Sequence, residues 1–210
     1  MKRRYEDFVF DIDGTLLDTE RTGVLSLMQT IRELTGVEMS YEEAYRFFGV
    51  PSSKAASTLG YADEARFAEV WEVHFQEMMY LVSPFPGVEA VLRDLHAGGA
   101  RMGIVTSRSR AEIAYDTHLA RLLPHFDALV CSEDSVRHKP FPDPMLAYLA
   151  RTGARKETTL YLGDTAYDWR CGHDAGCDFA LADWKGRGRQ DIEAEYYFTD
   201  AASLREILGI

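Results

Sequence analysis

Residues 8–18 read FVFDIDGTLLD, and this stretch decides the fold class. Phe8–Phe10 form a short apolar run of β-forming residues, and Asp11 and Asp13 follow at once. Alternate residues of a strand point to the same side, so the two carboxylates are expected to face one space. Gly14 then permits a sharp turn of the backbone. Because open α/β sheets build their sites at the carboxyl ends of strands, this stretch predicts a strand that ends in an acidic site.

Five more short apolar runs follow, and helical segments separate the later ones. The runs are Gly103–Val105, Ala128–Val130, Leu160–Leu162, Phe179–Leu181 and Tyr196–Phe198. They are continuous rather than alternating, as expected for strands buried on both faces of a parallel sheet. Strands that alternate with helices form βαβ units. We therefore expect an α/β protein with a doubly wound, Rossmann-like parallel sheet.

The interval between the first two runs is long and has helical patterns almost throughout. Residues 24–34 place apolar side chains on one helical face, and Ser40 with Glu43 forms a capping box for a second helix. Residues 67–79 repeat apolar side chains at the spacing of an amphipathic helix. His74 lies on that apolar stripe and is interpreted as a core histidine with its hydrogen bonds satisfied.

A small all-helical domain inserted after the first strand explains this interval. It is predicted to cover residues 17–82, with Pro84 and Pro86 marking the return of the chain. Residues 1–16 and 83–210 then form the Rossmann-like core domain.

Composition limits the partners of the chain. The net charge of −11 over 210 residues argues against nucleic acid or an anionic membrane as the main partner. No apolar stretch is long enough to span a membrane, and the N-terminus lacks the pattern of a signal peptide, so a cytoplasmic protein is expected. Cys131, Cys171 and Cys177 lack metal-type spacing and are expected to be buried, reduced thiols. The charged residues 185–189 are interpreted as a solvated loop, and a monomer or weak homodimer is expected.

Polar residues also end later strand runs. Thr106 and Ser107 follow the second run and offer hydroxyl and backbone N–H donors to a phosphate, and Asp164 and Asp168 follow the run at residues 160–162. Carboxylates that converge are unfavourable unless a cation lies between them. Mg²⁺ prefers oxygen ligands, so the strand ends predict a magnesium site.

Lys139 lies in the segment His138–Pro144 and offers a fixed positive charge beside this site. Asp143 followed by Pro144 is typical of a helix start with an aspartate N-cap, so Lys139 is expected just before a helix.

The order of these motifs resembles the haloacid dehalogenase-like hydrolases. The four matching motifs are Asp11-Ile12-Asp13-Gly14-Thr15, Thr106-Ser107, Lys139-Pro140, and Gly163-Asp164 with Asp168. The resemblance covers essentially the whole chain, including a helical cap after the first motif. Within the family the chain looks like the phosphoglycolate phosphatase-like branch, which implies a phosphatase that acts on a small phosphorylated metabolite.

The resemblance also implies a mechanism. Asp11 would attack phosphorus and form an aspartyl-phosphate, and Asp13 would protonate the leaving group and later deprotonate water. Mg²⁺ would be held by Asp11, by the backbone carbonyl of Asp13 and by Asp164. Asp168 would orient the metal waters or the lysine.

Phosphate oxygens would be held by Thr106, the Ser107 amide and Lys139, with Gly14 also in the phosphate site. Family members that cleave carbon–halogen or phosphorus–carbon bonds replace the second aspartate. Its presence at position 13 favours hydrolysis of phosphate esters or anhydrides.

Substrate-reading residues are less defined. Gly49 lies in a segment that resembles the specificity loop of the cap, and Arg46 and Lys54 beside it either read the substrate or lie on a solvated helix face. Arg108 and Arg110 either face the cleft and bind a second anionic group, or belong to a helix start that Ser109 and Glu112 would cap.

Several activities on this fold stay open at this point. A pyrophosphatase, a nucleotidase and a β-phosphoglucomutase-type mutase are the alternatives among enzymes. A phospho-acceptor receiver module also uses a strand-end aspartate, but it lacks the helical insertion and the second aspartate. A binding protein without catalytic activity is the other rival.

Overall fold

The computed structural model describes residues 5–50, 52–189 and 191–205, and its central element is a six-stranded sheet. The strand order is β5-β4-β1-β6-β7-β8, and the neighbours pair in parallel. The strands are β1 (Asp7–Phe10), β4 (Arg101–Val105), β5 (Ala128–Val130), β6 (Thr159–Gly163), β7 (Asp178–Ala182) and β8 (Tyr196–Phe198). Each contains one of the six apolar runs, so the predicted doubly wound α/β fold is confirmed.

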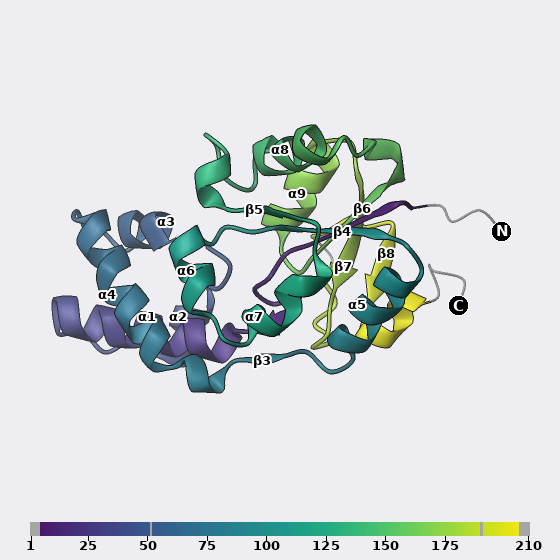
Figure 1. The fold of residues 1–210 in the computed structure, drawn as a ribbon. Helices are drawn as coiled ribbons and strands as arrows, with labels where there is room; N and C mark the ends of the chain where they lie inside the picture. The colour runs from purple at the N-terminus through teal and green to yellow at the C-terminus, as the bar shows by residue number, and fades with distance from the viewer. Residues whose placement is uncertain (1–4, 51, 190, 206–210) are drawn as a thin grey trace. The chain divides into compact units, whose positions relative to one another are not determined.

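Helices cover both faces of this sheet (Figure 1). On one face lie α8 (Asp143–Thr152) and α9 (Ala166–Asp174), and on the other lies α5 (Val88–Ala97). Shorter elements of the same unit are α6 (Arg110–Tyr115), α7 (Leu119–Leu122), η2 (Leu123–His125), η3 (Ser132–Asp134), η4 (Lys156–Thr158) and η5 (Ala201–Ser203). The α8–α9 face has a continuous buried core in which Val9, Tyr148 and Tyr161 take part.

Gly103 in β4 shows how tightly α8 packs on the sheet. A Cβ atom at this position would lie 2.1 Å from the ring of Tyr148. Tyr148 is fully buried, and its hydroxyl donates to a carboxylate oxygen of Asp7 at 3.2 Å. The glycine therefore makes room for the ring of Tyr148, which is held by its helix on one side and by the hydrogen bond to Asp7 on the other.

The chain divides into two compact units, residues 1–17 with 84–210, and residues 18–83. The second unit contains α1 (Glu20–Thr35), α2 (Tyr41–Tyr45), α3 (Ser52–Thr58), α4 (Glu64–Glu77) and η1 (Met79–Leu81). The two-residue strands β2 (Leu17–Asp18) and β3 (Ser83–Pro84) form a separate small sheet. The helical unit has its own buried core, which includes Val24, Leu27, Ile31, Ala44 and Phe67.

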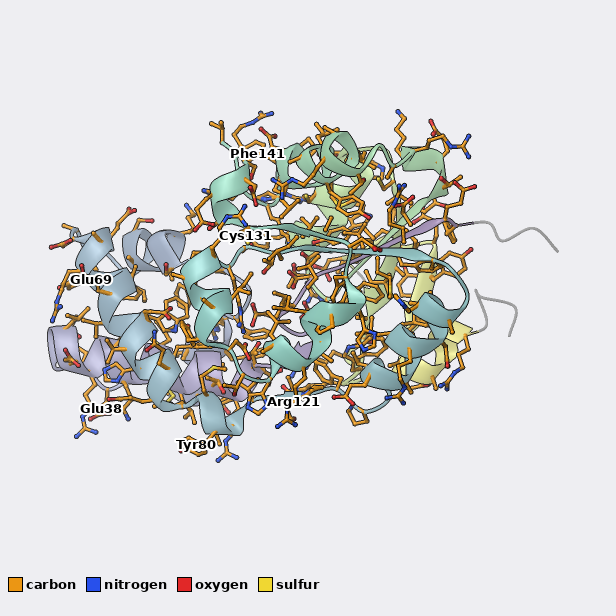
Figure 2. All side chains as sticks on the ribbon, viewed as in Figure 1. Glu38, Glu69, Tyr80, Arg121, Cys131 and Phe141 are labelled. Carbon is orange, nitrogen blue, oxygen red and sulfur yellow. The ribbon has the colours of Figure 1, made fainter. Side chains whose placement is uncertain are left out.

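Two local predictions in the helical unit have different outcomes. The capping box of Ser40 and Glu43 is present at the start of α2. His74 lies at the rim of the helical core rather than inside it. There its ring nitrogens lie 2.9 Å from a carboxylate oxygen of Glu33 and 3.2 Å from one of Glu77. On the surface of this unit, Glu38 pairs with Arg32 at 3.2 Å and Glu69 pairs with Arg66 at 3.4 Å (Figure 2).

The predicted aspartate N-cap before α8 is wrong. The helix begins at Asp143, and its N-cap residue is Pro142, with no side-chain cap. Pro142 has φ −71° and ψ −10°, already in the helical region, so the chain enters the helix one residue early. The Asp143 carboxylate accepts from the guanidinium of Arg137 instead, at 3.0 Å.

The three cysteines are free and buried, as expected from their spacing. Burial raises the pKa of the Cys131 thiol, at the end of β5 (Figure 2), to about 11 and that of Cys171 to about 12. Protonated, buried thiols of this kind act as small apolar side chains. Within the described ranges, every helix is too short or too polar to cross a bilayer.

The contact between Gly103 and Tyr148 generates a stability prediction. Gly103→Ala is expected to lower the free energy of unfolding by about 1–3 kcal/mol, because the added methyl group overlaps a fixed ring. Urea denaturation of Gly103→Ala, Tyr148→Leu and the double variant measures the coupling. The smaller side chain at position 148 should remove most of the cost of Gly103→Ala; fully additive losses would contradict the packing account.

Candidate active site

The carboxyl ends of β1, β4 and β6 bring the strand-end polar residues together. Phe10 of β1 is in register with Ile104 of β4 and with Leu162 of β6, so the three strands end at one edge. The order of strands reverses direction here, with β4 on one side of β1 and β6 on the other. A crevice at such a switch point is where doubly wound sheets bind ligands.

Lys139 makes the central contact of this edge. Its Nζ lies 2.7 Å from Oδ1 of Asp11 and 2.7 Å from Oδ1 of Asp168. The Lys139 side chain is 4% exposed and that of Asp168 is 2% exposed. Burial lowers the pKa of Lys139, but the two carboxylates raise it by more, so the net shift is upward. The amine therefore stays a buried cation that joins two buried carboxylates.

Asp168 is held in place by its own surroundings. Oδ1 also accepts from the Tyr161 hydroxyl at 3.0 Å, and Oδ2 accepts from the Thr165 backbone N–H at 3.1 Å. Thr165 and Asp168 form the capping box that starts α9. A Cβ atom at Gly163 would lie 2.4 Å from Cβ of Asp168, so glycine is required there. With both oxygens engaged, Asp168 fixes the position of the lysine.

Asp11, Asp164 and Asp168 form an acidic cluster. Each offers a carboxylate oxygen, and these oxygens lie within 4.8 Å of one another. Burial is the main reason why the pKa of Asp11 rises to about 7; Lys139 lowers it, while Asp168 and Asp13 raise it. Burial, with the charges of Asp168 and Asp11, also raises the pKa of Asp164 well above its usual value. The protein holds more negative charge here than Lys139 neutralises.

The cluster fits a hard divalent cation. Oδ1 of Asp164 is buried and has no hydrogen-bond partner among the described residues. Gly14 has φ +82°, and a Cβ atom there would lie 2.2 Å from Oδ2 of Asp164. Glycine thus lets the backbone turn after Asp13 approach the Asp164 carboxylate. Carboxylate and backbone oxygens in close approach are the ligands that Mg²⁺ prefers.

The residues after β4 divide into different environments. The Thr106 hydroxyl is buried and accepts from the Arg108 backbone N–H at 3.2 Å, while Ser107 is exposed. The Arg108 guanidinium contacts Asp13 and Asp116, and although burial lowers its pKa, these carboxylates raise it by more. Arg110 instead pairs with Asp134 at 2.5 Å.

The segment after Arg108 begins a helix, which was the second of the two alternatives drawn from the sequence. Ser109 and Glu112 form the capping box of α6. Arg46, Gly49 and Lys54 belong to the helical unit, where all three are exposed. Their assignment to the substrate stays a prediction.

A loop after β7 contributes contacts that the sequence analysis missed. The indole N–H of Trp184 donates to the Thr15 carbonyl at 2.8 Å, and Arg189 donates to the Asp164 carbonyl at 3.3 Å. These bonds hold the backbone of the first and last motifs. Residues 185–188 are an exposed loop, as expected, whereas Arg189 is partly exposed and contacts a residue 25 positions away, which no local pattern reveals.

The fold and the site define a class of protein: a doubly wound α/β protein with a buried lysine and a cluster of carboxylates at its switch point. The chain belongs to the haloacid dehalogenase-like hydrolase family, whose model matches residues 8–182. This confirms the resemblance drawn from the motifs.

Individual relatives match nearly the full length. Pyrophosphatase PpaX of Bacillus cereus is 29% identical over 195 residues, which cover 91% of this chain and 89% of the relative. The crystal structure of a phosphoglycolate phosphatase candidate from Lactobacillus plantarum has a TM-score of 0.89 at 23% identity, covering 97% of this chain and 99% of that one. The hydrolase candidate YfnB of Bacillus subtilis, bound to magnesium, has a TM-score of 0.76 at 20% identity, covering 99% and 100%.

The excess negative charge of the cluster generates a second prediction. Asp164→Asn should raise the Tm of the metal-free protein, because it removes one buried carboxylate from a repelling group. Roughly 2–4 °C is expected for each kcal/mol of repulsion removed. Thermal denaturation with and without Mg²⁺ is the measurement, and the wild type should gain stability from Mg²⁺ while Asp164→Asn gains little.

Asp174→Asn is the matched control, since Asp174 is exposed and pairs with His173. It should leave both the Tm and the response to Mg²⁺ nearly unchanged. An Asp164→Asn variant that is less stable without metal, and equally stabilised by Mg²⁺, would sink the assignment.

Proposed function

We propose that this protein is a magnesium-dependent phosphatase that hydrolyses a small phosphorylated metabolite through an aspartyl-phosphate on Asp11. The observation that carries the proposal is the buried Lys139–Asp11 contact at the switch point of the sheet, within the acidic cluster of Asp164 and Asp168. A buried lysine beside a buried aspartate lowers the pKa of that carboxyl group against the effect of burial, and so favours the ionised form that an attacking nucleophile requires.

The reaction proceeds in two displacements at phosphorus. In the first, an oxygen of Asp11 forms a bond to phosphorus while the bond to the leaving oxygen breaks, and Asp13 gives that oxygen a proton. In the second, the water oxygen forms a bond to phosphorus while the bond between phosphorus and the Asp11 oxygen breaks, and Asp13 takes a proton from the water. Lys139, the Thr106 hydroxyl and the Ser107 amide hold the transferring oxygens, with the glycine turn at Gly14 beside them.

Magnesium fits the remaining oxygens. The carboxylates of Asp11 and Asp164 and the backbone carbonyl of Asp13 would hold it, whereas Asp168 is already engaged by Lys139, Tyr161 and Thr165. When bound, the ion supplies neutralisation of the charge on the phosphoryl oxygens.

Pyrophosphate is the first candidate substrate, and a small phosphate monoester is the second. The first is supported by the PpaX relative, which spans 91% of this chain. The second is supported by the L. plantarum protein of the same fold, a phosphoglycolate phosphatase candidate. The helical unit of residues 18–83 is the element that would choose between them, as a cap that excludes water from the reaction.

Kinetics of two variants test the mechanism. Asp11→Asn should abolish turnover of pyrophosphate and of an aryl phosphate, because the amide is not a nucleophile. Asp13→Ala should lower kcat by at least about 100-fold, since it removes the general acid and base. Phosphate release in the presence of Mg²⁺ is the measurement. Near-normal turnover by Asp11→Asn would refute the assignment of the nucleophile.

A further inference from the structure

Arg108 closes a second ion pair in the site, separate from that of Lys139. Its Nε lies 2.8 Å from Oδ2 of Asp13, and its Nη2 lies 2.6 Å from Oδ1 of the same carboxylate. The Arg108 side chain is 6% exposed. A guanidinium that donates to both oxygens sets the plane and direction of a carboxylate, which a single contact does not. Asp13 is therefore held in one orientation.

Asp116 anchors the other side of the guanidinium. Its Oδ2 lies 2.6 Å from Nη1 of Arg108, and its Oδ1 accepts from the backbone N–H groups of His118 and Leu119, each at 2.9 Å. The Asp116 side chain is completely buried. Withdrawing Arg108 would leave a buried carboxylate without its cation, which is strongly unfavourable.

The Arg108 backbone is fixed as well. Its N–H donates to the Thr106 hydroxyl at 3.2 Å, and its carbonyl accepts from the Ser132 backbone N–H at 2.9 Å. The residue is tethered at both ends of its side chain. This leaves Arg108 poorly placed to swing onto an anionic substrate, which was one of the two alternatives drawn from the sequence.

The site therefore assigns a different cation to each catalytic carboxylate. Lys139 contacts Asp11 and Arg108 contacts Asp13. Asp13 lies two residues from Asp11, so without Arg108 its carboxylate would be drawn toward the lysine.

We propose that Arg108, anchored by Asp116, is a positioning residue that fixes the Asp13 carboxylate for proton exchange with the leaving group. The inference rests on the proposed role of Asp13 as general acid and base. In the step concerned, Asp13 starts as the protonated acid; the phosphorus–oxygen bond to the leaving group breaks, the electron pair goes to that oxygen, and the oxygen takes the proton, which leaves Asp13 as the carboxylate that Arg108 holds. A displaced Asp13 leaves that oxygen without its proton.

The dependence of the rate on the leaving group separates positioning from other roles. A nitrophenolate departs readily without being protonated. The departure of the more basic phenolate depends more strongly on proton donation. Arg108→Lys keeps a cation near Asp116 but loses the two-oxygen contact with Asp13. It should lower kcat for phenyl phosphate by about 10-fold or more, and that for p-nitrophenyl phosphate by less than about 3-fold, with KM nearly constant.

The experiment measures kcat and KM of the full-length protein for a series of substituted phenyl phosphates with saturating Mg²⁺. Asp116→Asn serves as the second variant, because its single amide oxygen cannot accept both from the backbone N–H groups of His118 and Leu119 and from Arg108. It should show the same steeper dependence on the leaving group. Circular dichroism establishes that each variant is folded. Asp13→Asn shows how much the leaving-group dependence of kcat changes when the general acid is lost completely.

Arg101→Lys is the matched control. Arg101 also grips a buried carboxylate with Nε and Nη2, that of Asp7, but at the opposite end of β1 and β4. It should lower the Tm and leave the dependence on the leaving group as in the wild type.

Three results would overturn the proposal. A rise in KM for every substrate with unchanged leaving-group dependence would make Arg108 a substrate-binding residue. If Arg108→Lys and Asp116→Asn behave like Arg101→Lys while Asp13→Asn still changes the leaving-group dependence, the ion pair is purely structural. The proposed function would then remain intact. Absence of turnover by the wild type, or an Asp13→Asn variant without effect, would instead remove the proposed function and this inference with it.

Discussion

The buried ammonium group of Lys139 stabilises carboxylates at the edge of the sheet that would otherwise repel one another. Three carboxylates, of Asp11, Asp164 and Asp168, converge within 4.8 Å at that edge, and the lysine contacts two of them. Burial makes each unneutralised carboxylate costly, as the raised pKa values of Asp11 and Asp164 show. The protein thus keeps a locally unfavourable cluster of carboxylates, and such a cluster fits a divalent cation.

The parallel sheet makes this arrangement possible with little special backbone structure. Three neighbouring strands end in register, so side chains from distant parts of the chain meet without a long loop. Two glycines complete the geometry, because Gly14 and Gly163 leave space that the carboxyl groups of Asp164 and Asp168 occupy. The same edge separates its cations, with Lys139 on Asp11 and Arg108 on Asp13. That separation supports the different roles proposed for the two aspartates of one motif.

The fold was predictable because buried parallel strands leave continuous apolar runs, and all six runs became strands. The strand-end residues were also readable, since the ends of parallel strands share an edge. Contacts made by long side chains were not. Arg108 pairs with Asp13, 95 residues away, as well as with Asp116, and the partner of Trp184 lies 169 residues away. Such contacts depend on three-dimensional packing, which periodicity does not encode.

The central claim is that Asp11 carries the phosphoryl group, and chemical trapping tests it most directly. The protein is mixed with pyrophosphate or an aryl phosphate and Mg²⁺, quenched in the steady state, and reduced with borohydride, which converts an aspartyl-phosphate into homoserine. Peptide mass spectrometry then locates the modified residue. The account predicts homoserine at position 11 and at no other aspartate. Modification of a different residue, or efficient turnover with no trapped intermediate under any quench condition, would contradict it.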